Sequence, residues 1–502
     1  MSSQGPHPAL RATFSREERE KGPYLIGVDV GTTSVKAALI ETDGRIARSF
    51  SRPVATTRPG PGLAEQNPAD WTACVDAALH ELTDGLPSGA VAALGLCSQV
   101  NTHVFVDSRG EALRPAILWQ DGRCGDEAAA LDAQVTPEDK LKYWGAPLPI
   151  DASHVLSRMA WVARHEPDIW RRTRWVMAPK DYCLLKLTGE AVADPMSAFG
   201  VVDQTLAYVP ELIALVPGAA ERLPPLQGLT ARIGRILPGL PGAGTRVANA
   251  TMDAWAGLLG AGATRQGDGF YLSGTSEVGG IVSRERHPTP GVIAFPECEG
   301  LTLHAGPTQA GGASVAWLAN LLGRDPADIC ELAARADPDR PTPIFLPHLQ
   351  GERAPIWDID ARGCFAGLDG SMGAPELALA VLEGVAYSVR WLFEALDASA
   401  GAAPRRLRHA GGGARSDVWR QIRADVLDRE IERVEGLDSG LVGAAILAGV
   451  GAGLFGSIDE AAATLVRPER VVTPNPARRA RYDEGFARYV ELYGRLKGFR
   501  GG

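Results

Sequence analysis

The stretch Tyr24–Ala37 reads YLIGVDVGTTSVKA and predicts a β-hairpin with a polar tip. Apolar runs flank Asp29 and the turn Gly31-Thr32-Thr33-Ser34, and each run has the length of a buried strand. The glycine lets backbone N–H groups face one point, and the Thr32 and Thr33 hydroxyls add donors, which suits a phosphate. A carboxylate at Asp29 suits Mg²⁺, which prefers oxygen ligands. On this stretch alone, an ordinary hairpin with a polar turn is the alternative.

The bulk composition is that of a large globular protein. The chain has 502 residues, 45% of them apolar and 22% charged, which predicts two to four domains. A net charge of −9 disfavours nucleic acid or an anionic membrane as the main partner. Seven scattered cysteines without a CxxC pair indicate a reducing, cytoplasmic compartment. The polar residues 1–22 predict a disordered leader rather than a secretory signal.

The stretch Ser439–Ile458 carries no charge over 20 residues. It is rich in Gly and Ala and only weakly hydrophobic. We therefore predict a helix buried in a soluble core; a membrane span is the weaker alternative.

The chain around the first hairpin predicts an antiparallel meander and not the βαβ start of a dinucleotide fold. Asp43-Gly44 marks a tight turn, and Arg45–Val54 continues as a third strand. Further on, the sequence predicts a helix over 69–82 capped by Asn67-Pro68, a strand over 90–97, a polar loop over 98–103 and a strand over 104–107. In the middle of the chain it predicts an irregular connection over 210–244, and then a strand over 246–253 followed by a small-residue helix.

A second hairpin repeats the first. Gly269–Val282 again places a hydroxyl-bearing turn, Gly274-Thr275-Ser276, between apolar strands, and Gly274 lies 243 positions after Gly31. Two similar halves could therefore grip two phosphates of one nucleotide across a cleft.

Glycine clusters mark two further turns of the second half. Gly411-Gly412-Gly413 separates a strand from a helix, and Gly311-Gly312 precedes another helix. Three glycines at such a junction let a base or phosphate lie against the backbone. A strand and helix packed too closely for side chains would need the same glycines.

Together these motifs resemble the FGGY carbohydrate kinases, nearest to the xylulose kinase branch, from about Tyr24 to Lys497. The motifs are Asp29-x-Gly31-Thr32-Thr33, Pro179-Lys180-Asp181-Tyr182, Asp253 before a small-residue helix, Gly274-Thr275-Ser276, Gly351-Glu352-Arg353-x-Pro355, the signature within Gly363–Glu383, and Gly411-Gly412-Gly413-Ala414. The resemblance implies an α/β fold of two actin-like (ribonuclease H-like) domains. Each has a mixed five-stranded sheet flanked by helices, with the active-site cleft between them. We expect a sugar-binding domain over 23–262 and an ATP-binding domain over 263–502.

The resemblance also implies roles for single residues, with ATP and Mg as cofactors. Asp253 would be the general base, kept ionised by the helix N-terminus, and Asp29 would coordinate Mg²⁺ through water. The remaining residues would meet the nucleotide: Thr32 and Thr33 the γ-phosphate, Gly274, Thr275 and Ser276 the β- and γ-phosphates, Gly312 the phosphates, and Gly411, Gly412 and Gly413 the nucleoside.

The sugar loop departs from the family pattern. Where xylulose kinases carry Gln-Met-His-Gly, this chain has Gln99-Val100-Asn101-Thr102, and we expect Gln99, Val100, Asn101, Asp121, Arg123 and Asp253 to face the substrate. His103 is either another hydroxyl partner or a residue that starts a strand.

The expected reaction is phosphorylation of a small sugar, either a ketose such as D-xylulose or another ketose or polyol. Glycerol is disfavoured, because glycerol kinases carry Gln-Arg-Glu in the sugar loop and a Gln after the base. This chain has neither the Arg nor the Glu, and Ala254 follows Asp253. A regulatory actin-like ATPase and a sugar-binding pseudo-enzyme are further alternatives. The sequence leaves open whether the chain works alone or as a homodimer.

Overall fold

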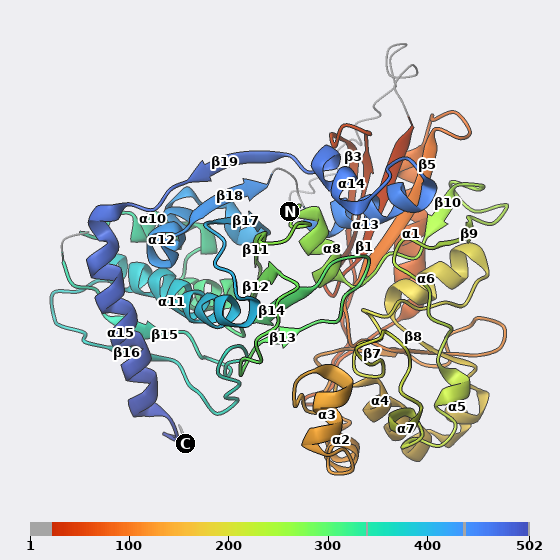
Figure 1. The fold of residues 1–502 in the computed structure, drawn as a ribbon, viewed down its shortest axis with the longest axis horizontal. Coiled ribbons are helices and arrows are strands. Elements are labelled where there is room, and N and C mark those ends of the chain that lie inside the picture. The colour runs from red at the N-terminus through yellow and green to blue at the C-terminus, as the bar shows by residue number, and fades with distance from the viewer. Residues whose placement is uncertain (1–22, 338–339, 435–437, 500–502) are drawn as a thin grey trace, which may run out of the picture.

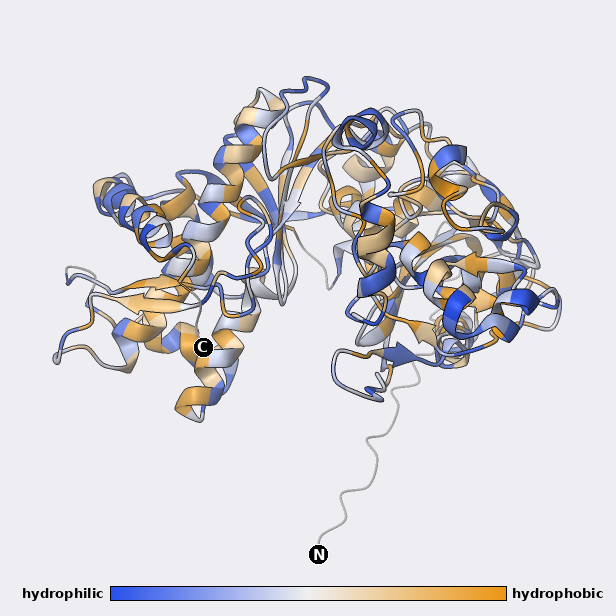
Figure 2. Ribbon diagram, turned by 90° about the horizontal axis from the view of Figure 1, so that it is seen from below, coloured by the Kyte–Doolittle hydropathy of each residue, from blue (hydrophilic) through white to orange (hydrophobic). Residues whose placement is uncertain are grey.

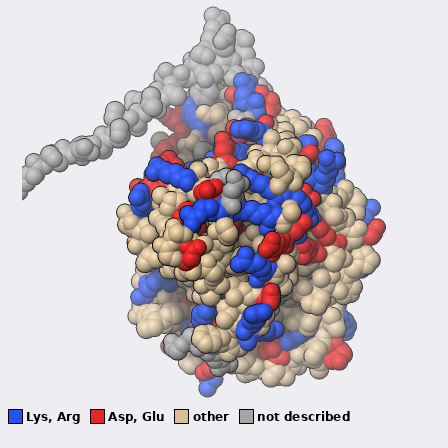
Figure 3. Space-filling model, turned by 90° about the vertical axis from the view of Figure 1, so that its left-hand side faces the viewer, with Lys and Arg blue, Asp and Glu red and all other residues tan. Residues whose placement is uncertain are grey.

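The computed structural model describes residues 23–337, 340–434 and 438–499, so the leader predicted for residues 1–22 lies outside them. The chain forms two lobes, each built around a mixed β-sheet with flanking helices (Figure 1). Seen from below, the two lobes lie side by side (Figure 2). Acidic and basic side chains are interspersed on the face of the second lobe that Figure 3 shows.

The first sheet has the strand order β3-β2-β1-β5-β10-β9. Its strands are β1 (Tyr24–Val30), β2 (Ser34–Ile40), β3 (Ile46–Pro53), β5 (Val91–Ser98), β9 (Arg232–Arg235) and β10 (Arg246–Ala248). β1 pairs antiparallel with β2, placing Asp29 opposite Lys36, and β2 pairs antiparallel with β3. The predicted hairpin and meander are therefore confirmed. β5 then joins β1 in parallel, and β10 joins β5 in parallel.

The second sheet has the order β13-β14-β12-β11-β17-β18-β19. Its strands are β11 (Gly269–Ser273), β12 (Glu277–Val282), β13 (Ile293–Ala294), β14 (Leu303–Pro307), β17 (Arg406–Ala410), β18 (Glu430–Val434) and β19 (Pro468–Val472). Its five inner strands repeat the antiparallel and parallel pairings of β3-β2-β1-β5-β10. The internal duplication inferred from the two hairpins is thus a duplication of a whole sheet.

The expected count of five strands in each sheet is too low for the described residues. Antiparallel edge strands account for the difference: β9 in the first sheet, and β13 and β19 in the second. β9 lies within residues 210–244, which the sequence predicted to be irregular. The sequence does not indicate this strand, because Arg232–Arg235 is largely exposed and lacks a strong apolar pattern.

The first lobe contains helices on both faces of its sheet and a smaller subdomain below it (Figure 1). Its helices are α1 (Pro68–Thr83), α2 (Gly125–Asp132), α3 (Pro137–Trp144), α4 (Val155–His165), α5 (Pro167–Arg172), α6 (Pro179–Thr188), α7 (Pro210–Ile213), η2 (Ala220–Arg222) and α8 (Asp253–Gly260). Short ribbons pair β4 (Glu65–Gln66) with β7 (Ala116–Ile117) and β6 (Val104–Val106) with β8 (Trp175–Met177). The predicted cap of α1 is confirmed, since the Asn67 side chain accepts a hydrogen bond from the Ala69 N–H.

The second lobe is built around the long helix α11. Its helices are α9 (Gly312–Leu322), α10 (Pro326–Ala333), α11 (Ala374–Ala400), η3 (Gly412–Arg415), α12 (Asp417–Leu427), η4 (Pro476–Arg478) and α15 (Arg479–Leu496), and β15 (Ile344–Leu346) pairs with β16 (Cys364–Ala366). The helices α13 (Ser439–Ala452) and α14 (Ile458–Leu465) belong to the same half of the sequence but pack on the first lobe (Figure 1). α11 packs between the sheet and α15, where aromatic side chains fill the core.

Helix α13 explains the uncharged stretch of the sequence. It packs against β1 and β5 of the first sheet and against α8, so segments from both halves of the chain build this layer. The approach is close: a Cβ at Gly27 would lie 2.0 Å from the Leu441 carbonyl oxygen, and one at Gly95 would lie 2.2 Å from the Ala444 carbonyl oxygen. The predicted single helix over 439–458 is wrong in length, because α13 ends at Ala452 before the left-handed Gly453. Among the described helices, none combines the length and apolar character needed to cross a membrane.

Candidate active site

The first hairpin presents Thr32 and Thr33 at the edge where β1 ends. Thr33 is exposed, and Thr32 is held by its neighbours. The Thr32 hydroxyl donates to Gln99 Oε1 (3.1 Å) and accepts from Trp119 Nε1 (3.0 Å), while its carbonyl accepts from Gln66 Nε2 (2.6 Å). Thr32 therefore fixes the turn to Gln99 of the sugar loop, whereas Thr33 is exposed to solvent.

Asp29 is a buried carboxylate next to this turn. Its Oδ1 has no hydrogen-bond partner among the described residues, and its side chain interacts with the charges of Asp438, Asp253 and Lys36. Burial and the two neighbouring carboxylates raise the pKa of Asp29 well above its usual range, although Lys36 opposes the shift. An unsatisfied acid in this setting gains from a bound cation.

The residues around Asp29 fit Mg²⁺ bound together with a nucleotide. No group of three or more His, Cys, Asp or Glu within the described ranges is arranged to hold a metal. Mg²⁺ commonly binds one or two carboxylates together with waters and phosphate oxygens, and does not need a complete cage of protein ligands. A single orphaned carboxylate oxygen at Asp29 suits that mode of binding.

Asp253 is the first residue of α8. The chain leaves β10 at Ala248, and Ala250 adopts a left-handed conformation (φ 55°) before the helix starts. The Asp253 Oδ1 accepts a hydrogen bond from the Ala254 N–H (2.7 Å). Burial, reinforced by the charge of Asp438, nevertheless raises the pKa of Asp253 to about 6. The helix N-terminus was expected to keep this carboxylate ionised, but the effect of burial on its pKa is larger than that of the Ala254 N–H. With a pKa of about 6, most of the carboxylate is still ionised at neutral pH.

Asp438 is a third carboxylate of this cluster, and the sequence analysis missed it. It caps α13, with its Oδ1 accepting from the Gly440 N–H (3.0 Å), and its Oδ2 lies 2.6 Å from Lys36 Nζ. Its charge contributes to the raised pKa values of both Asp29 and Asp253. The available signal was an acid directly before an uncharged helix, which is an N-cap position at a buried helix end.

The second hairpin presents an exposed turn at Gly274 and Thr275. The N-terminus of α9 packs against this turn: the Gly312 N–H donates to the Gly274 carbonyl (2.9 Å), and the Ala313 N–H donates to the Thr275 carbonyl (3.0 Å). Gly312 therefore lies beside Gly274, and Ser276 is partly exposed; that these residues contact the phosphates stays a prediction.

The turn Gly411-Gly412-Gly413 lies beside the second hairpin. Gly411 has a φ of +95°, and a Cβ there would lie 2.4 Å from the Ser273 carbonyl oxygen, so close packing requires this glycine. Gly412 is different: a Cβ there would meet nothing within 4 Å. Both alternatives for this motif thus have support, with Gly411 packed against the sheet and Gly412 facing open space.

A buried ion pair between Arg423 and Glu277 lies next to these two turns. Arg423 Nη2 lies 3.0 Å from Glu277 Oε1, both side chains are fully buried, and Arg423 Nη1 donates to the Gly413 carbonyl (2.9 Å). The Ser273 hydroxyl also donates to Glu277. The sequence analysis assigned no role to Glu277 or Arg423, because nothing in their local pattern shows that they meet.

The sugar loop begins with a residue that braces the site. Gln99 is 2% exposed, and its side chain binds the hydroxyls of Thr32 and Thr102. Val100 is partly buried against the core, whereas Asn101 has a left-handed φ of 55° and donates to Ser153 Oγ (3.2 Å).

Comparison with known proteins agrees with this architecture. The N-terminal domain of the FGGY family of carbohydrate kinases matches residues 24–260, and the C-terminal domain of that family matches residues 269–452. The chain belongs to the FGGY family of carbohydrate kinases. It is 32% identical to a xylulose kinase of Escherichia coli over 94% of this chain and 99% of the relative, and 29% identical to a gluconokinase of Bacillus licheniformis over 87% and 89%. The structure of a ligand-bound xylulose kinase from Lactobacillus acidophilus superposes with a TM-score of 0.86 at 26% identity, covering 95% and 98% of the two chains.

The fold brings carboxylates from distant parts of the chain together. Asp29, Asp253 and Asp438 come from β1, α8 and the start of α13, and they interact electrostatically at the ends of β1 and β10. The predicted carboxylates Asp29 and Asp253 thus share one site.

Asp121 and Arg123, which were expected to face the substrate, make several contacts within the first lobe. Asp121 is fully buried and binds Arg123 Nη2 (2.6 Å) and the Ala64 N–H (2.6 Å). Arg123 also lies 2.8 Å from Glu65. These contacts favour a structural role in holding the loop that carries Trp119; direct contact with the sugar stays a prediction. Trp119 itself is 40% exposed and hydrogen-bonded to Thr32, and the predicted site did not include it.

Proposed function

We propose that this carbohydrate kinase transfers the γ-phosphate of ATP, with Mg²⁺, to a hydroxyl of a small sugar such as D-xylulose. The observation that carries the proposal is that Asp253, whose pKa is about 6, shares one cluster of carboxylates with Asp29, whose Oδ1 has no hydrogen-bond partner among the described residues. Phosphoryl transfer needs positioning and charge neutralisation, and these two groups supply a base and a metal-side carboxylate.

In this proposal Asp253 accepts the proton of the attacking sugar hydroxyl. A carboxylate with a pKa of about 6 is largely ionised at pH 7, and it is more basic than an ordinary aspartate, so it can take up a proton during transfer. Thr251 Oγ1 donates to Asp194 Oδ1 (2.8 Å), which fixes the segment that leads to the base.

The nucleotide would lie between the two hairpins. From the first lobe, Thr33 offers its exposed hydroxyl and Thr32 its backbone, because the Thr32 hydroxyl already donates to Gln99. The turn Gly274–Ser276 offers hydroxyl and backbone donors from the second lobe, with Gly312 beside it. Gly412, in open space next to Gly411 and Gly413, leaves room for the nucleoside. Mg²⁺, held on the Asp29 side, would neutralise phosphate charge.

The cellular setting is part of the same proposal. All seven cysteines lie in described positions and are free, which supports a reducing compartment such as the cytoplasm.

A coupled assay of ADP release over ketoses, polyols and sugar acids tests the proposal. D-Xylulose is the first candidate because xylulose kinases are among the relatives; D-gluconate is included because gluconokinases are among them too. We expect ADP release that depends on both sugar and Mg²⁺. ATP hydrolysis that no sugar stimulates would favour an actin-like ATPase instead.

A further inference from the structure

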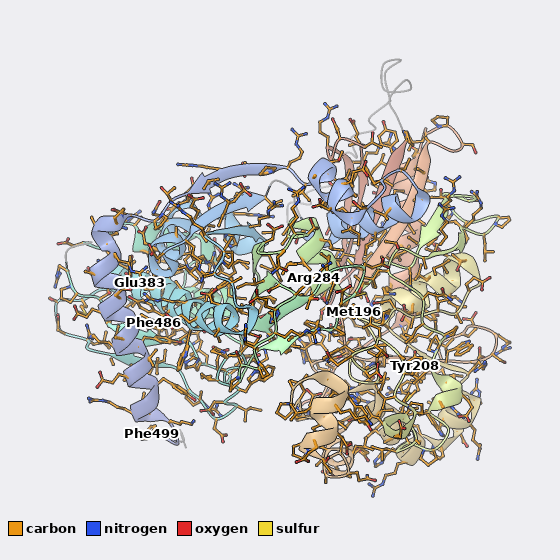
Figure 4. The ribbon with its side chains drawn as sticks, in the orientation of Figure 1. Met196, Tyr208, Arg284, Glu383, Phe486 and Phe499 are labelled. Atoms are coloured by element: carbon orange, nitrogen blue, oxygen red, sulfur yellow. The ribbon has the colours of Figure 1, made fainter. Side chains whose placement is uncertain are left out.

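A cavity of about 40 Å³ lies in the first lobe next to the sugar loop. Its polar lining comes from Asn101, His103, Asp181, Ser197 and Tyr208, and Phe199 forms part of its apolar wall. Figure 4 shows Tyr208 within the first lobe, far from the sheet of the second lobe.

The cavity begins at the same sheet edge as the base. Ser98 at the end of β5 pairs with Met252, directly before Asp253, and Asn101 follows three residues after Ser98. Because the carboxyl ends of parallel strands meet at one edge, Asn101 and Asp253 project from neighbouring strand ends. The base and Asn101, which lines the cavity, thus lie at the same edge of the first sheet.

Two buried polar atoms on cavity-lining residues lack partners within the described residues. They are His103 Nδ1 and Ser197 Oγ, and His103 is only 8% exposed. The backbone holds both residues in place: the His103 N–H donates to the Ile117 carbonyl (3.1 Å), and the Ser197 N–H donates to Asp194 Oδ1 (3.0 Å). A sugar hydroxyl both donates and accepts, so it can satisfy either atom.

The charges around the cavity disfavour an anion. Its lining contains no Lys or Arg, and Asp181 is an acid. The neighbouring Lys180 is neutralised by Asp181 (2.5 Å) and Asp194 (3.0 Å). Burial and the charge of Arg158 hold the pKa of His103 well below its usual range, so that the ring is neutral at pH 7.

We propose that this cavity receives the end of the sugar remote from the reacting hydroxyl, and thereby selects a neutral open-chain ketose or polyol over a sugar acid. This inference rests on the proposed kinase function. It assigns to His103 and Ser197 the recognition of hydroxyl groups that the transfer reaction leaves unchanged.

The test compares Ser197→Ala with the wild-type enzyme on the best neutral substrate of the panel, for example D-xylulose, and on D-gluconate. We expect the wild type to prefer the neutral sugar, and Ser197→Ala to raise the sugar KM about tenfold while the ATP KM is unchanged. Ala198→Leu, which fills the cavity, should raise the sugar KM further. Ser51→Ala on the exposed face of β3 is the matched control and should change neither constant.

Each outcome separates the two proposals. A wild type that phosphorylates no sugar overturns the proposed function, and this inference with it. An active wild type whose sugar KM is the same in Ser197→Ala and Ala198→Leu, or which prefers D-gluconate, overturns the cavity assignment alone. Isothermal titration of the same sugars and of ATP gives a second measurement that does not depend on turnover.

Discussion

Asp253→Asn should abolish most of the activity and at the same time stabilise the fold at neutral and alkaline pH. The folded-state pKa of Asp253 is about 6, against an ordinary value of 3.8. The native state therefore binds this proton more tightly than the unfolded state does. As a result, the ionised side chain opposes folding above pH 6. A shift of roughly 2 units corresponds to at most about 3 kcal/mol, because one unit is 1.36 kcal/mol.

The pH dependence gives the sign of the effect. The free energy of unfolding of Asp253→Asn should exceed that of the wild type by up to about 3 kcal/mol at pH 8. The difference should shrink as the pH falls through 6 and disappear only below 3.8, where the wild-type carboxyl becomes protonated in the unfolded state as well. Urea unfolding at several pH values measures this difference.

The kinetic half of the prediction uses the same group. Asp253→Asn should lower kcat by about 10²–10⁴, the usual contribution of a general base, with ATP binding largely intact. Wild-type kcat/KM should fall below pH 6, because only about a tenth of a group with this pKa is ionised at pH 5.

A control separates catalysis from desolvation. Asp76 lies in α1, and burial raises its pKa too, so Asp76→Asn should also stabilise the fold but leave kcat unchanged. If Asp253→Asn kept near-wild-type kcat, or lost stability at pH 8, the assignment of a desolvated base to this position would be refuted.

Three further predictions concern the groups around the base. Asp29→Asn should raise the Mg²⁺ concentration for half-maximal activity by on the order of tenfold, measured by Mg²⁺ titration at saturating ATP, since it removes a carboxylate that orders the metal's surroundings; an unchanged Mg²⁺ requirement would contradict this. Thr251→Val breaks the bond to Asp194 and should lower kcat about tenfold with the ATP KM unchanged, whereas Thr251→Ser should retain activity. Arg423→Met leaves Glu277 buried and unpaired and should cost about 3–5 kcal/mol of stability in urea unfolding, part of which a second change, Glu277→Gln, should restore.

The sequence by itself determined the hairpins, their duplication and two of the three clustered carboxylates. A strand's apolar run and a Gly-Thr turn are local features, and they survive unchanged in the structure at Tyr24–Ile40 and Gly269–Val282. Asp29 and Asp253 could be singled out because each follows or ends an apolar run.

Only the tertiary structure decided how these pieces meet. α13 comes from the second half of the sequence but packs on β1 and β5, which brings Asp438 next to Lys36, Asp29 and Asp253. The pKa of Asp253 is set by burial, which no local pattern reveals, and the support of the glycine turns by Glu277 and Arg423 joins residues 146 positions apart. Local sequence dictates backbone conformation, whereas desolvation and charge coupling depend on contacts between distant segments, and these contacts exist only in the folded chain.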